Sequence, residues 1–219
     1  MTVIPVIVVG GGGHASVLLD ELSISGHKVL GVVDPNLSVG TKVLYSKVLG
    51  NDEYLVQYSS TQIQLVNGIG ALPGKKARQA VAEELERKGY RFRSVVSSRA
   101  TISDSSRIAK GAQILAGAVI QTNVEVGEDV VVNTGANIDH DCVLADNVWI
   151  SPGAILCGNV TVESGVYVGA GAVVVQSVTL GTGAVIAAGS VVTKSVEANS
   201  RHHALRSRFE GRNKENTDG

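Results

Sequence analysis

From Ile102 onward, an Ile, Leu or Val recurs at every sixth position, with Gly, Asp and Asn crowded between them. This period fits neither the 3.6-residue turn of an α-helix nor the alternation of a single strand. It predicts short strands joined by tight corners, each with one branched side chain turned inward. The periodic positions are Ile102, Ile108, Ile114, Ile120, Val126, Val132, Ile138, Leu144, Ile150, Leu156, Val162, Val168, Val174, Leu180, Ile186 and Val192.

A second column runs in step with the first. Four residues after each periodic position lies a small or β-branched residue, from Ser106 through Ala112 to Val196. Because each short strand buries little alone, successive coils must stack and hydrogen-bond to one another. The pattern therefore predicts an all-β solenoid over residues 98–198.

This period resembles the hexapeptide repeat of left-handed parallel β-helix acyltransferases. In that family, three hexapeptides form one triangular coil of about 18 residues. The left-handed twist is implied by the resemblance and not by the spacing.

The first part of the chain has a different pattern. Apolar runs that suit strands, at 3–9, 29–33, 63–66 and 90–96, alternate with helical patterns at 14–22, 51–57 and 77–88. Strands that alternate with helices predict a small parallel sheet, so we expect a Rossmann-like α/β domain over residues 1–97. After Val196 the period stops, and residues 199–219 are expected to form a basic polar tail.

The composition of the chain limits the kinds of partner that it is expected to bind. Hydrophobic residues make up 44% and aromatic residues only 4%, which suits a narrow prism filled by aliphatic side chains. A net charge of −1 gives no reason to expect a nucleic acid or a membrane surface as a partner. Cys142 and Cys157 offer neither a disulfide framework nor a zinc site. Without a signal peptide or an apolar run of transmembrane length, we expect a soluble cytoplasmic protein.

Four glycines, Gly10 to Gly13, separate the first strand from the first helix. Unpaired N–H groups and the helix dipole at such a turn favour a phosphate. Asp34, followed by Pro35, ends the second strand where ribose-binding acids are found. Ser16 stands where a third Gly or Ala completes the NAD fingerprint. The loop therefore favours a mononucleotide or a nucleotide-diphospho-sugar, with a plain βα turn and NAD as alternatives.

Gly12, Gly13, His14, Asp34 and Pro35 are the candidate substrate-binding residues at this loop. His14 can hydrogen-bond a phosphate or a sugar, or it can cap its own helix.

The repeat contains a single histidine, His140, flanked by Asp139 and Asp141. It follows the inward residue Ile138 by two places, so we expect it near a corner with its side chain outward. In a coil of about 18 residues, Gly158 stacks beside it and leaves open space for a thioester or an amine. A histidine suits proton transfer at neutral pH, and a neighbouring carboxylate fixes its tautomer. The alternative is an ordinary surface histidine.

Metal is not expected. Zinc sites on similar prisms need three converging histidines, and this repeat has one.

Both halves together resemble the bacterial sialic acid O-acetyltransferase and nucleotide-sugar N-acetyltransferase family, including perosamine- and bacillosamine-pathway types. The match extends to about residue 196. The motifs that carry it are Gly11-Gly-Gly-His-Ala15, Asp34, Ser98-Arg-Ala-Thr-Ile102, Asn133-Thr-Gly-Ala136, Asp139-His-Asp-Cys142, Pro152-Gly-Ala154 and Gly189-Ser-Val-Val-Thr-Lys194.

The resemblance implies a homotrimer with active sites between neighbouring prisms and acetyl-CoA in the groove between them. It implies that His140 is the general base, that Asp141 tunes it, and that the first domain holds a nucleotide-linked amino sugar. The positions that it implies for coenzyme contacts are Trp149, Ala170 and Ala188, and the open space expected at Gly158 is a further candidate contact for the coenzyme.

The sequence departs from the family at two places. Where Trp149 stands, many members carry a second histidine, so Trp149 either flanks the groove with Tyr167 or packs in a subunit interface. The usual Gly-x-Pro-Ala after the last coil is absent, and cations from Arg201 to Arg212 follow instead. These cations either meet the coenzyme phosphates or belong to a solvated tail.

These observations favour an acetyl-CoA-dependent N-acetyltransferase that acts on the amine of a nucleotide-linked amino sugar, such as a 4-amino-4,6-dideoxyhexose. We expect direct transfer, without an acyl-enzyme at Cys142. The rival activities are O-acetylation of a sialic acid or related sugar, and a non-catalytic trimeric scaffold that binds nucleotides. The sequence leaves open whether the nucleotide is UDP- or GDP-linked and which amino sugar it carries.

Overall fold

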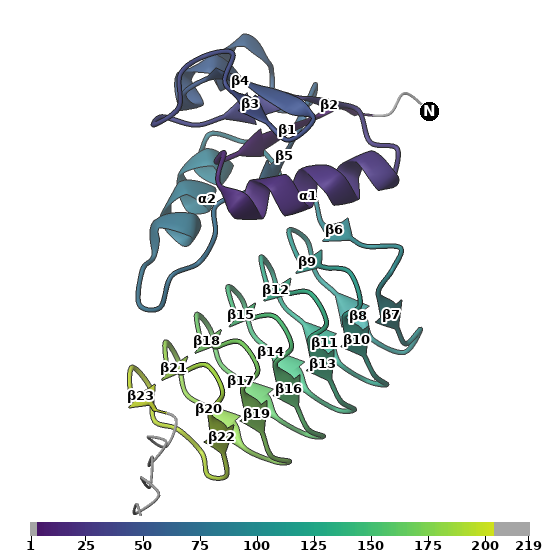
Figure 1. Ribbon diagram of the computed structural model, residues 1–219, viewed down its shortest axis with the longest axis vertical. Coiled ribbons are helices and arrows are strands. Elements are labelled where there is room, and N and C mark those ends of the chain that lie inside the picture. The colour runs from purple at the N-terminus through teal and green to yellow at the C-terminus, as the bar shows by residue number, and fades with distance from the viewer. Residues whose placement is uncertain (1–3, 204–219) are drawn as a thin grey trace, which may run out of the picture.

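The computed structural model describes residues 4–203, which form an α/β domain above an elongated triangular prism (Figure 1). This arrangement confirms the predicted fold class, a small parallel sheet followed by a left-handed β-helix. The cations Arg206, Arg208 and Arg212, predicted to belong to the tail, lie outside the described residues.

The first domain is built around a five-stranded sheet of order β3-β4-β2-β1-β5. The central strand β1 is completely buried, which explains its unbroken apolar run. No helix among residues 4–203 has the length and apolarity needed to cross a membrane. The elements are β1 Val6–Val9, α1 Gly13–Ile24, β2 Val29–Val33, β3 Lys42–Val43, β4 Ser46–Gly50, the 3-10 helix η1 Asp52–Gln57, β5 Gln64–Asn67 and α2 Ala77–Arg87.

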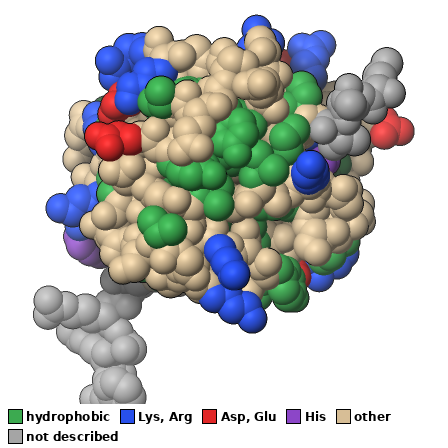
Figure 2. Space-filling model, turned by 90° about the horizontal axis from the view of Figure 1, so that it is seen from above, with side chains coloured by type: hydrophobic (Ala, Val, Ile, Leu, Met, Phe, Trp, Pro, Cys, Tyr) green, Lys and Arg blue, Asp and Glu red, His purple; other side chains and the backbone are tan. Residues whose placement is uncertain are grey.

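The β3–β4 hairpin was not predicted. Strand β4 pairs in parallel with β2, and β3 pairs antiparallel with β4 around a turn at Leu44, whose φ is 49°. Strand β3 has two residues, which is too short to show an alternating pattern, so no sequence signal indicated the hairpin. Seen from above, this end of the molecule has apolar side chains near its middle and cations around its margin (Figure 2).

The prism consists of three parallel sheets with six, five and seven short strands. The seven-stranded sheet faces the first domain. The strands are β6 Val95–Val96, β7 Thr101–Ile102, β8 Arg107–Ile108, β9 Gln113–Ile114, β10 Val119–Ile120, β11 Glu125–Val126, β12 Val131–Val132, β13 Asn137–Ile138, β14 Val143–Leu144, β15 Trp149–Ile150, β16 Ile155–Leu156, β17 Thr161–Val162, β18 Tyr167–Val168, β19 Val173–Val174, β20 Thr179–Leu180, β21 Val185–Ile186, β22 Val191–Val192 and β23 Arg201–His202.

From β6 to β22, each strand pairs with the strand eighteen residues away, as in the register of Ile120 with Ile138 and of Trp149 with Tyr167. The last pairing is shorter, because Val185 pairs with Arg201. From Ile114 to Val192, every periodic side chain is at most 3% exposed, so the six-residue period marks the interior as predicted. Ile102 and Ile108 are only partly buried, because they lie at the open end of the prism.

Both ends of the prism extend beyond the repeat. Residues 90–96, predicted as one strand, are divided: Phe92 bridges to Leu65 in the first sheet, whereas Val95–Val96 pairs with Gln113–Ile114 in the prism. At the other end, Arg201–His202 pairs with β21, so part of the segment expected as a tail is a strand of the prism.

The two domains share one apolar core. Helix α1 lies over the first coils of the prism (Figure 1), and its Leu18 and Leu22 pack in the same cluster as Val95 and Leu115. Arg99 of the prism forms an ion pair with Glu21, whose side chain is 2% exposed. The first domain is therefore fixed against one face of the prism.

Neighbouring residues of β14 allow a direct test of the inward column. Leu144 is 1% exposed, whereas Val143 is 40% exposed. We expect Leu144→Ala to lower the free energy of unfolding by about 2–5 kcal/mol because it leaves a cavity. The matched variant Val143→Ala should change it by about 0.5 kcal/mol or less. Equal losses in denaturant titrations would contradict the assigned orientation of the strand.

Candidate active site

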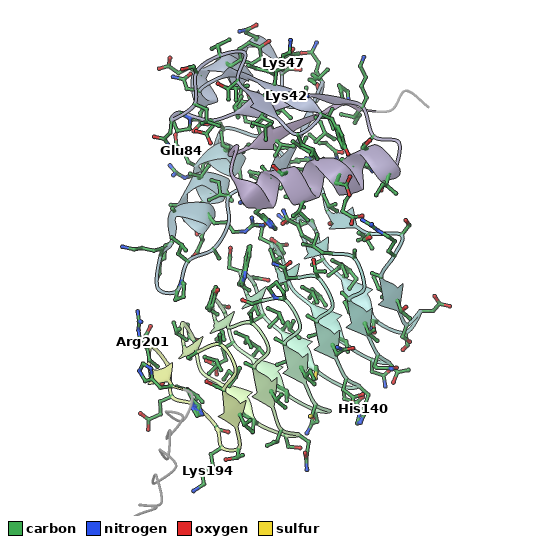
Figure 3. All side chains as sticks on the ribbon, in the orientation of Figure 1. Lys42, Lys47, Glu84, His140, Lys194 and Arg201 are labelled. Carbon is green, nitrogen blue, oxygen red and sulfur yellow. The ribbon has the colours of Figure 1, made fainter. Side chains whose placement is uncertain are left out.

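His140 lies at a vertex of the triangular prism. It is in the corner between β13 and β14, and therefore between the six-stranded and five-stranded sheets. This vertex is opposite the seven-stranded sheet that carries the first domain. Figure 3 accordingly shows His140 at the edge of the prism, far below α1. The predicted outward corner position is thus observed.

A chain of hydrogen bonds holds the imidazole. Nδ1 of His140 donates to Oδ2 of Asp141 at 2.7 Å, and Nδ2 of Asn123 donates to the other carboxylate oxygen at 3.1 Å. The His140 side chain is 55% exposed. Its Nε2 atom has no hydrogen-bond partner within residues 4–203, so its lone pair faces solvent.

The carboxylates set the proton affinity of this ring. The hydrogen bond to Asp141, followed by the charge of Asp139, raises the pKa of His140 above its ordinary value. The hydrogen bonds from His140 and Asn123 lower the pKa of Asp141. Asp141 is therefore an ionised acceptor that fixes the tautomer with a proton on Nδ1.

The backbone of this corner repeats in every coil. Asn123, Asp141, Asn159 and Ser177 follow one another at eighteen-residue steps, and all four have φ between 58° and 59°. Asn and Asp tolerate this left-handed conformation better than most residues. The shared corner geometry stacks the side chain of Asn123 on that of Asp141.

Gly158 lies directly beside His140, but it does not leave an empty space. A Cβ atom at Gly158 would lie 2.6 Å from both Cε1 and Nε2 of the imidazole. The ring therefore occupies the space that the sequence analysis assigned to a thioester or an amine. The missing side chain of Gly158 allows the ring to approach the next coil closely.

Cys142, the neighbouring thiol, is buried and donates from Sγ to the carbonyl oxygen of Cys157 at 3.2 Å. Burial raises its pKa to about 11, so it remains a protonated thiol at neutral pH.

The glycine loop forms a separate cradle at the start of α1. Gly12 is the N-cap of the helix, and a Cβ atom at Gly12 or Gly13 would meet no atom within 4 Å. Asp34 supports the loop, because its Oδ2 accepts from the N–H of Gly11 at 2.7 Å and its Oδ1 from the N–H of Asn36 at 2.8 Å. Pro35 is exposed beside it. The loop is open to a ligand.

His14 extends from this loop to the prism. Its Nε2 donates to Oε1 of Gln113 at 2.7 Å, and its ring centroid lies 5.0 Å from that of Trp149. Burial, with a smaller contribution from Arg78, lowers the pKa of His14 to about 4, so the ring is neutral at pH 7. His14 thus contacts the prism as well as adjoining the glycine loop.

Trp149 is 8% exposed and lies between the two domains of the chain, with the Arg78 guanidinium carbon 5.7 Å from its ring. Trp149 pairs with Tyr167 on the adjacent strand, and both line a cavity between the two domains. A coenzyme groove flanked by this pair and a packed subunit interface both stay predictions. Ala170 and Ala188 are exposed at a different vertex, between the seven-stranded and six-stranded sheets.

The candidate residues therefore fall in separate places. The structure brings His140, Asp141 and Gly158 together, and it groups Gly12, Gly13, Asp34 and Pro35 around the loop. Within one chain it does not bring either group to Ala170 and Ala188. Among residues 4–203, no cluster of three or more His, Cys, Asp or Glu side chains is arranged to hold a metal ion.

Three residues of these sites were missed by the sequence analysis. Asn123 stands eighteen residues before Asp141, so stacking the coils would have found it. Gln113 and Arg78 gave no comparable signal, because their roles depend on how the first domain docks on the prism.

The comparisons agree with this two-part architecture. Residues 5–85 match the family described as PglD N-terminal domain, and residues 141–176 match the bacterial transferase hexapeptide family. No curated protein gave a significant sequence match.

Several solved structures share the fold over nearly the whole chain. GDP-perosamine N-acetyltransferase from Caulobacter crescentus, in a histidine mutant bound to CoA and GDP-perosamine, has a TM-score of 0.85 at 28% identity, covering 96% of this chain and 98% of that one. The acetyltransferase domain of PglB from Neisseria gonorrhoeae, bound to acetyl coenzyme A, has a TM-score of 0.83 at 28% identity and covers 91% and 96%. WeeI from Acinetobacter baumannii has a TM-score of 0.81 at 25% identity and covers 90% and 95%.

The fold and these matches define the class: the chain is an acyltransferase, and its two parts are similar to the PglD N-terminal domain and to the bacterial transferase hexapeptide repeat. The predicted resemblance to nucleotide-sugar N-acetyltransferases is confirmed.

Two glycine variants test the geometry of the His140 corner. The three atoms nearest to a Cβ atom at Gly158 would all belong to the exposed His140 ring, whereas a Cβ atom at Gly127 would lie 2.8 Å from the carbonyl carbon of Ala145. We expect Gly158→Ala to displace the imidazole, keep the melting temperature nearly unchanged and slow acyl transfer. Gly127→Ala should lower the melting temperature, because backbone atoms must move. A large loss of stability in Gly158→Ala would contradict this packing.

Proposed function

We propose that the protein is an acetyl-CoA-dependent N-acetyltransferase that acts on the amine of a nucleotide-linked amino sugar. The observation that carries this proposal is the hydrogen-bonded chain Asn123–Asp141–His140, which leaves the imidazole Nε2 free and basic at an exposed vertex. The relatives bound to CoA and GDP-perosamine support the same chemistry.

His140 acts as the general base. As the sugar amine attacks the thioester carbonyl, a C–N bond forms and Nε2 takes a proton from the nitrogen. The tetrahedral intermediate then expels the coenzyme thiolate, which receives that proton. Asp141 remains ionised and stabilises the imidazolium. Because the Cys142 thiol has its pKa raised to about 11, direct transfer is favoured over an acyl-enzyme.

The separation of the two candidate sites within one chain supports an active site that includes a second chain. Within one chain, the glycine loop and His140 lie on opposite sides of the prism, because the first domain covers the face opposite the His140 vertex. We propose a homotrimer in which a neighbouring prism brings its own surface to this vertex. The exposed vertex of Ala170 and Ala188 would then contact acetyl-CoA from the adjacent subunit.

The glycine loop receives the nucleotide. The open backbone at Gly12 and Gly13 and the N-terminus of α1 suit the diphosphate. Asp34 keeps lone pairs for a ribose hydroxyl, and Pro35 forms the exposed edge of the site. His14 reaches the same loop from its position against Gln113.

Replacement of His140 tests the function directly. Because general-base catalysis contributes about 10²–10⁴ in rate, we expect His140→Ala to lower kcat by about that factor with little change in KM. The measurement is release of free thiol from acetyl-CoA with UDP- and GDP-linked 4-amino sugars. Undiminished turnover by the variant would exclude the proposed base, and no turnover by the natural protein with any amino sugar would favour a non-catalytic scaffold.

The pH profile gives an independent test. The base works only when unprotonated, and Asp141 raises its pKa, so activity should rise with pH through a limb above 6.5, the ordinary value for histidine. In Asp141→Asn the pKa of His140 falls, and we expect the acid limb to move to lower pH while the maximal rate decreases. A limb that stays in place would show that Asp141 does not tune the base.

Asn123 is expected to position Asp141. Asn123→Gly keeps the left-handed backbone and removes the amide that donates to Asp141, so we expect a lower kcat and an acid limb shifted to lower pH. The matched control is Asn159→Gly, because Asn159 has a φ of 59° and its amide donates to Ser177 instead. Equal kinetic effects of the two variants would show that the loss is merely structural.

A further inference from the structure

A buried polar network joins the domain of the glycine loop to the prism. Gln113 precedes the inward residue of β9, and its side chain is completely buried beneath the first domain. Its Nε2 donates to the carbonyl oxygen of Asn67, the last residue of β5, at 2.9 Å, and its Oε1 lies 2.7 Å from Nε2 of His14. Because a buried amide must satisfy its hydrogen bonds, these partners restrict how Gln113 is arranged.

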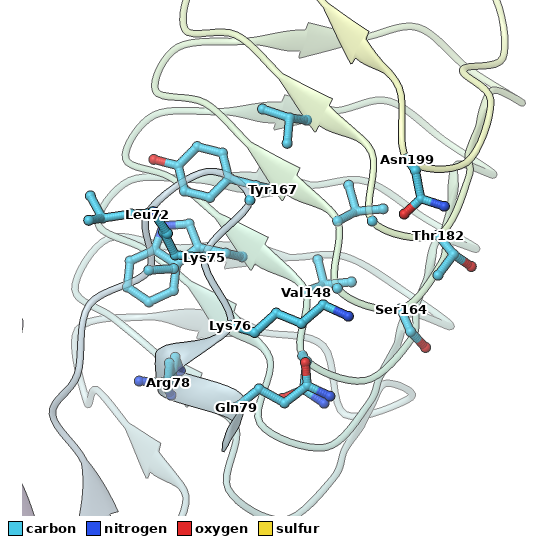
Figure 4. Close-up of a pocket in the computed structure, with 18 of the residues that line it drawn as sticks. Leu72, Lys75, Lys76, Arg78, Gln79, Val148, Ser164, Tyr167, Thr182 and Asn199 are labelled. Carbon is cyan, nitrogen blue, oxygen red and sulfur yellow. The ribbon is translucent and has the colours of Figure 1, made fainter. Parts of the chain in front are cut away.

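The amide of Gln113 has one favourable orientation. The carbonyl oxygen of Asn67 also accepts from Nη1 of Arg78 at 2.8 Å, so donors occupy both of its lone pairs. Figure 4 shows Arg78 on the wall of the cavity between the start of α2 and the prism. A rotated amide would place Oε1 of Gln113 against the Asn67 carbonyl, and two acceptors cannot bond to each other. The amide oxygen of Gln113 therefore faces His14.

This orientation determines the tautomer of His14. Since Oε1 of Gln113 only accepts, the proton of the imidazole is on Nε2, and Nδ1 keeps a lone pair. Burial, with a smaller contribution from Arg78, lowers the pKa of His14 to about 4, so a second proton is absent at pH 7. The Trp149 ring packs against the imidazole with the centroids 5.0 Å apart. His14 thus offers a ligand an acceptor and no donor.

The Nδ1 atom is the polar atom of this ring that a ligand can reach. Among residues 4–203 it has no hydrogen-bond partner, and it is not one of the buried polar atoms that lack one. His14 is the second residue of α1 and follows Gly13 directly, so its lone pair adjoins the glycine loop. The oxygens of an ionised diphosphate are acceptors, so they cannot bond to Nδ1. A hydroxyl group can donate to it.

The order of groups along the proposed substrate selects which hydroxyl groups these are. In the proposed function, the diphosphate lies at Gly12 and Gly13 and the ribose at Asp34. Asp34 contacts the loop at Gly11, before the phosphate cradle, whereas His14 follows the cradle and faces the prism. In a nucleotide sugar the hexose and the ribose are at opposite ends of the diphosphate. The hexose is therefore the part of the substrate next to His14.

We propose that Gln113 of the prism is a positioning residue of the substrate site, which holds His14 as a hydrogen-bond acceptor for a hydroxyl group of the hexose. This inference rests on the proposed function, and it assigns His14 to the sugar and not to the diphosphate. The prism thus takes part in sugar recognition within its own chain, in addition to carrying His140.

The tautomer is tested by ¹⁵N NMR of His14 at pH 7. We expect a protonated Nε2 and an unprotonated Nδ1 in the natural protein. Gln113→Met keeps a similar side-chain length and removes the acceptor, so this preference should be lost. The matched control Gln64→Met removes the hydrogen bond from Arg93, 2.7 Å long, at the other end of β5 and should keep the natural tautomer. A protonated Nδ1 in the natural protein would overturn the proposal even if Gln113→Met does not fold.

Reading of the hexose is tested by isothermal titration calorimetry with UDP, GDP, UDP-glucose and GDP-mannose. We expect His14→Phe and Gln113→Met to weaken binding of the hexose-linked nucleotides by about two- to tenfold, the worth of one hydrogen bond. Both variants should bind UDP and GDP as the natural protein does, and Gln64→Met should bind all four normally.

Equal losses for the nucleotides with and without a hexose would assign His14 to the nucleotide and overturn the proposal. Failure of the natural protein to bind either hexose-linked nucleotide would also overturn it. Because binding requires no turnover, the expected binding pattern in a natural protein that releases no thiol would contradict the proposed catalysis and leave this role of Gln113 intact.

Discussion

The parallel backbone ladder between residues eighteen apart is the constraint on which the rest of the structure depends. Each N–H donates to a carbonyl oxygen in the next coil, as from Val119 to Ala136 and from Val131 to Val148, both at 2.9 Å. Because the coils up to β22 share one length, side chains at corresponding positions form columns along the prism. The interior columns supply the apolar core, and the corner columns supply the chemistry.

One corner column explains the His140 site. The left-handed residue at each step is Asn, Asp, Asn or Ser, whose short polar side chains can bond to the coil above or below. Asn123 donates to Asp141 in this way, and Asn159 donates to Ser177. Beside this column, Gly158 provides the room in which the imidazole lies. A change of one residue in the length of the coils between Asn123 and Gly158 would separate these groups.

The interior of the prism could be predicted from the sequence because its signal is local and repeated. Every inward residue from Ile114 to Val192 follows from the period alone, and the strand positions of β2 and β5 follow from their apolar runs. The vertex position of His140 also follows, since it depends only on its distance from Ile138. The position of Asn123 could have been predicted from the period as well, because Asn123 lies eighteen residues before Asp141.

The interface between the domains could not be predicted in this way. Gln113, Trp149 and Arg78 are far apart in sequence, and they meet only because α1 and α2 dock on the seven-stranded sheet. Their burial depends on tertiary packing, for which a single sequence carries no periodic signal. The same docking forms the cavity at the start of α2, and it also explains why Trp149 is covered within one chain.

The central claim is that the stacked coils hold His140 with its proton on Nδ1 and a free, basic Nε2. The most direct measurement is the ¹⁵N NMR spectrum of the imidazole of His140 in the natural protein, followed over a pH titration. We expect the Nδ1–H tautomer and a pKa above the ordinary value of 6.5. An Nε2–H tautomer, or a pKa at or below the ordinary value, would contradict the account.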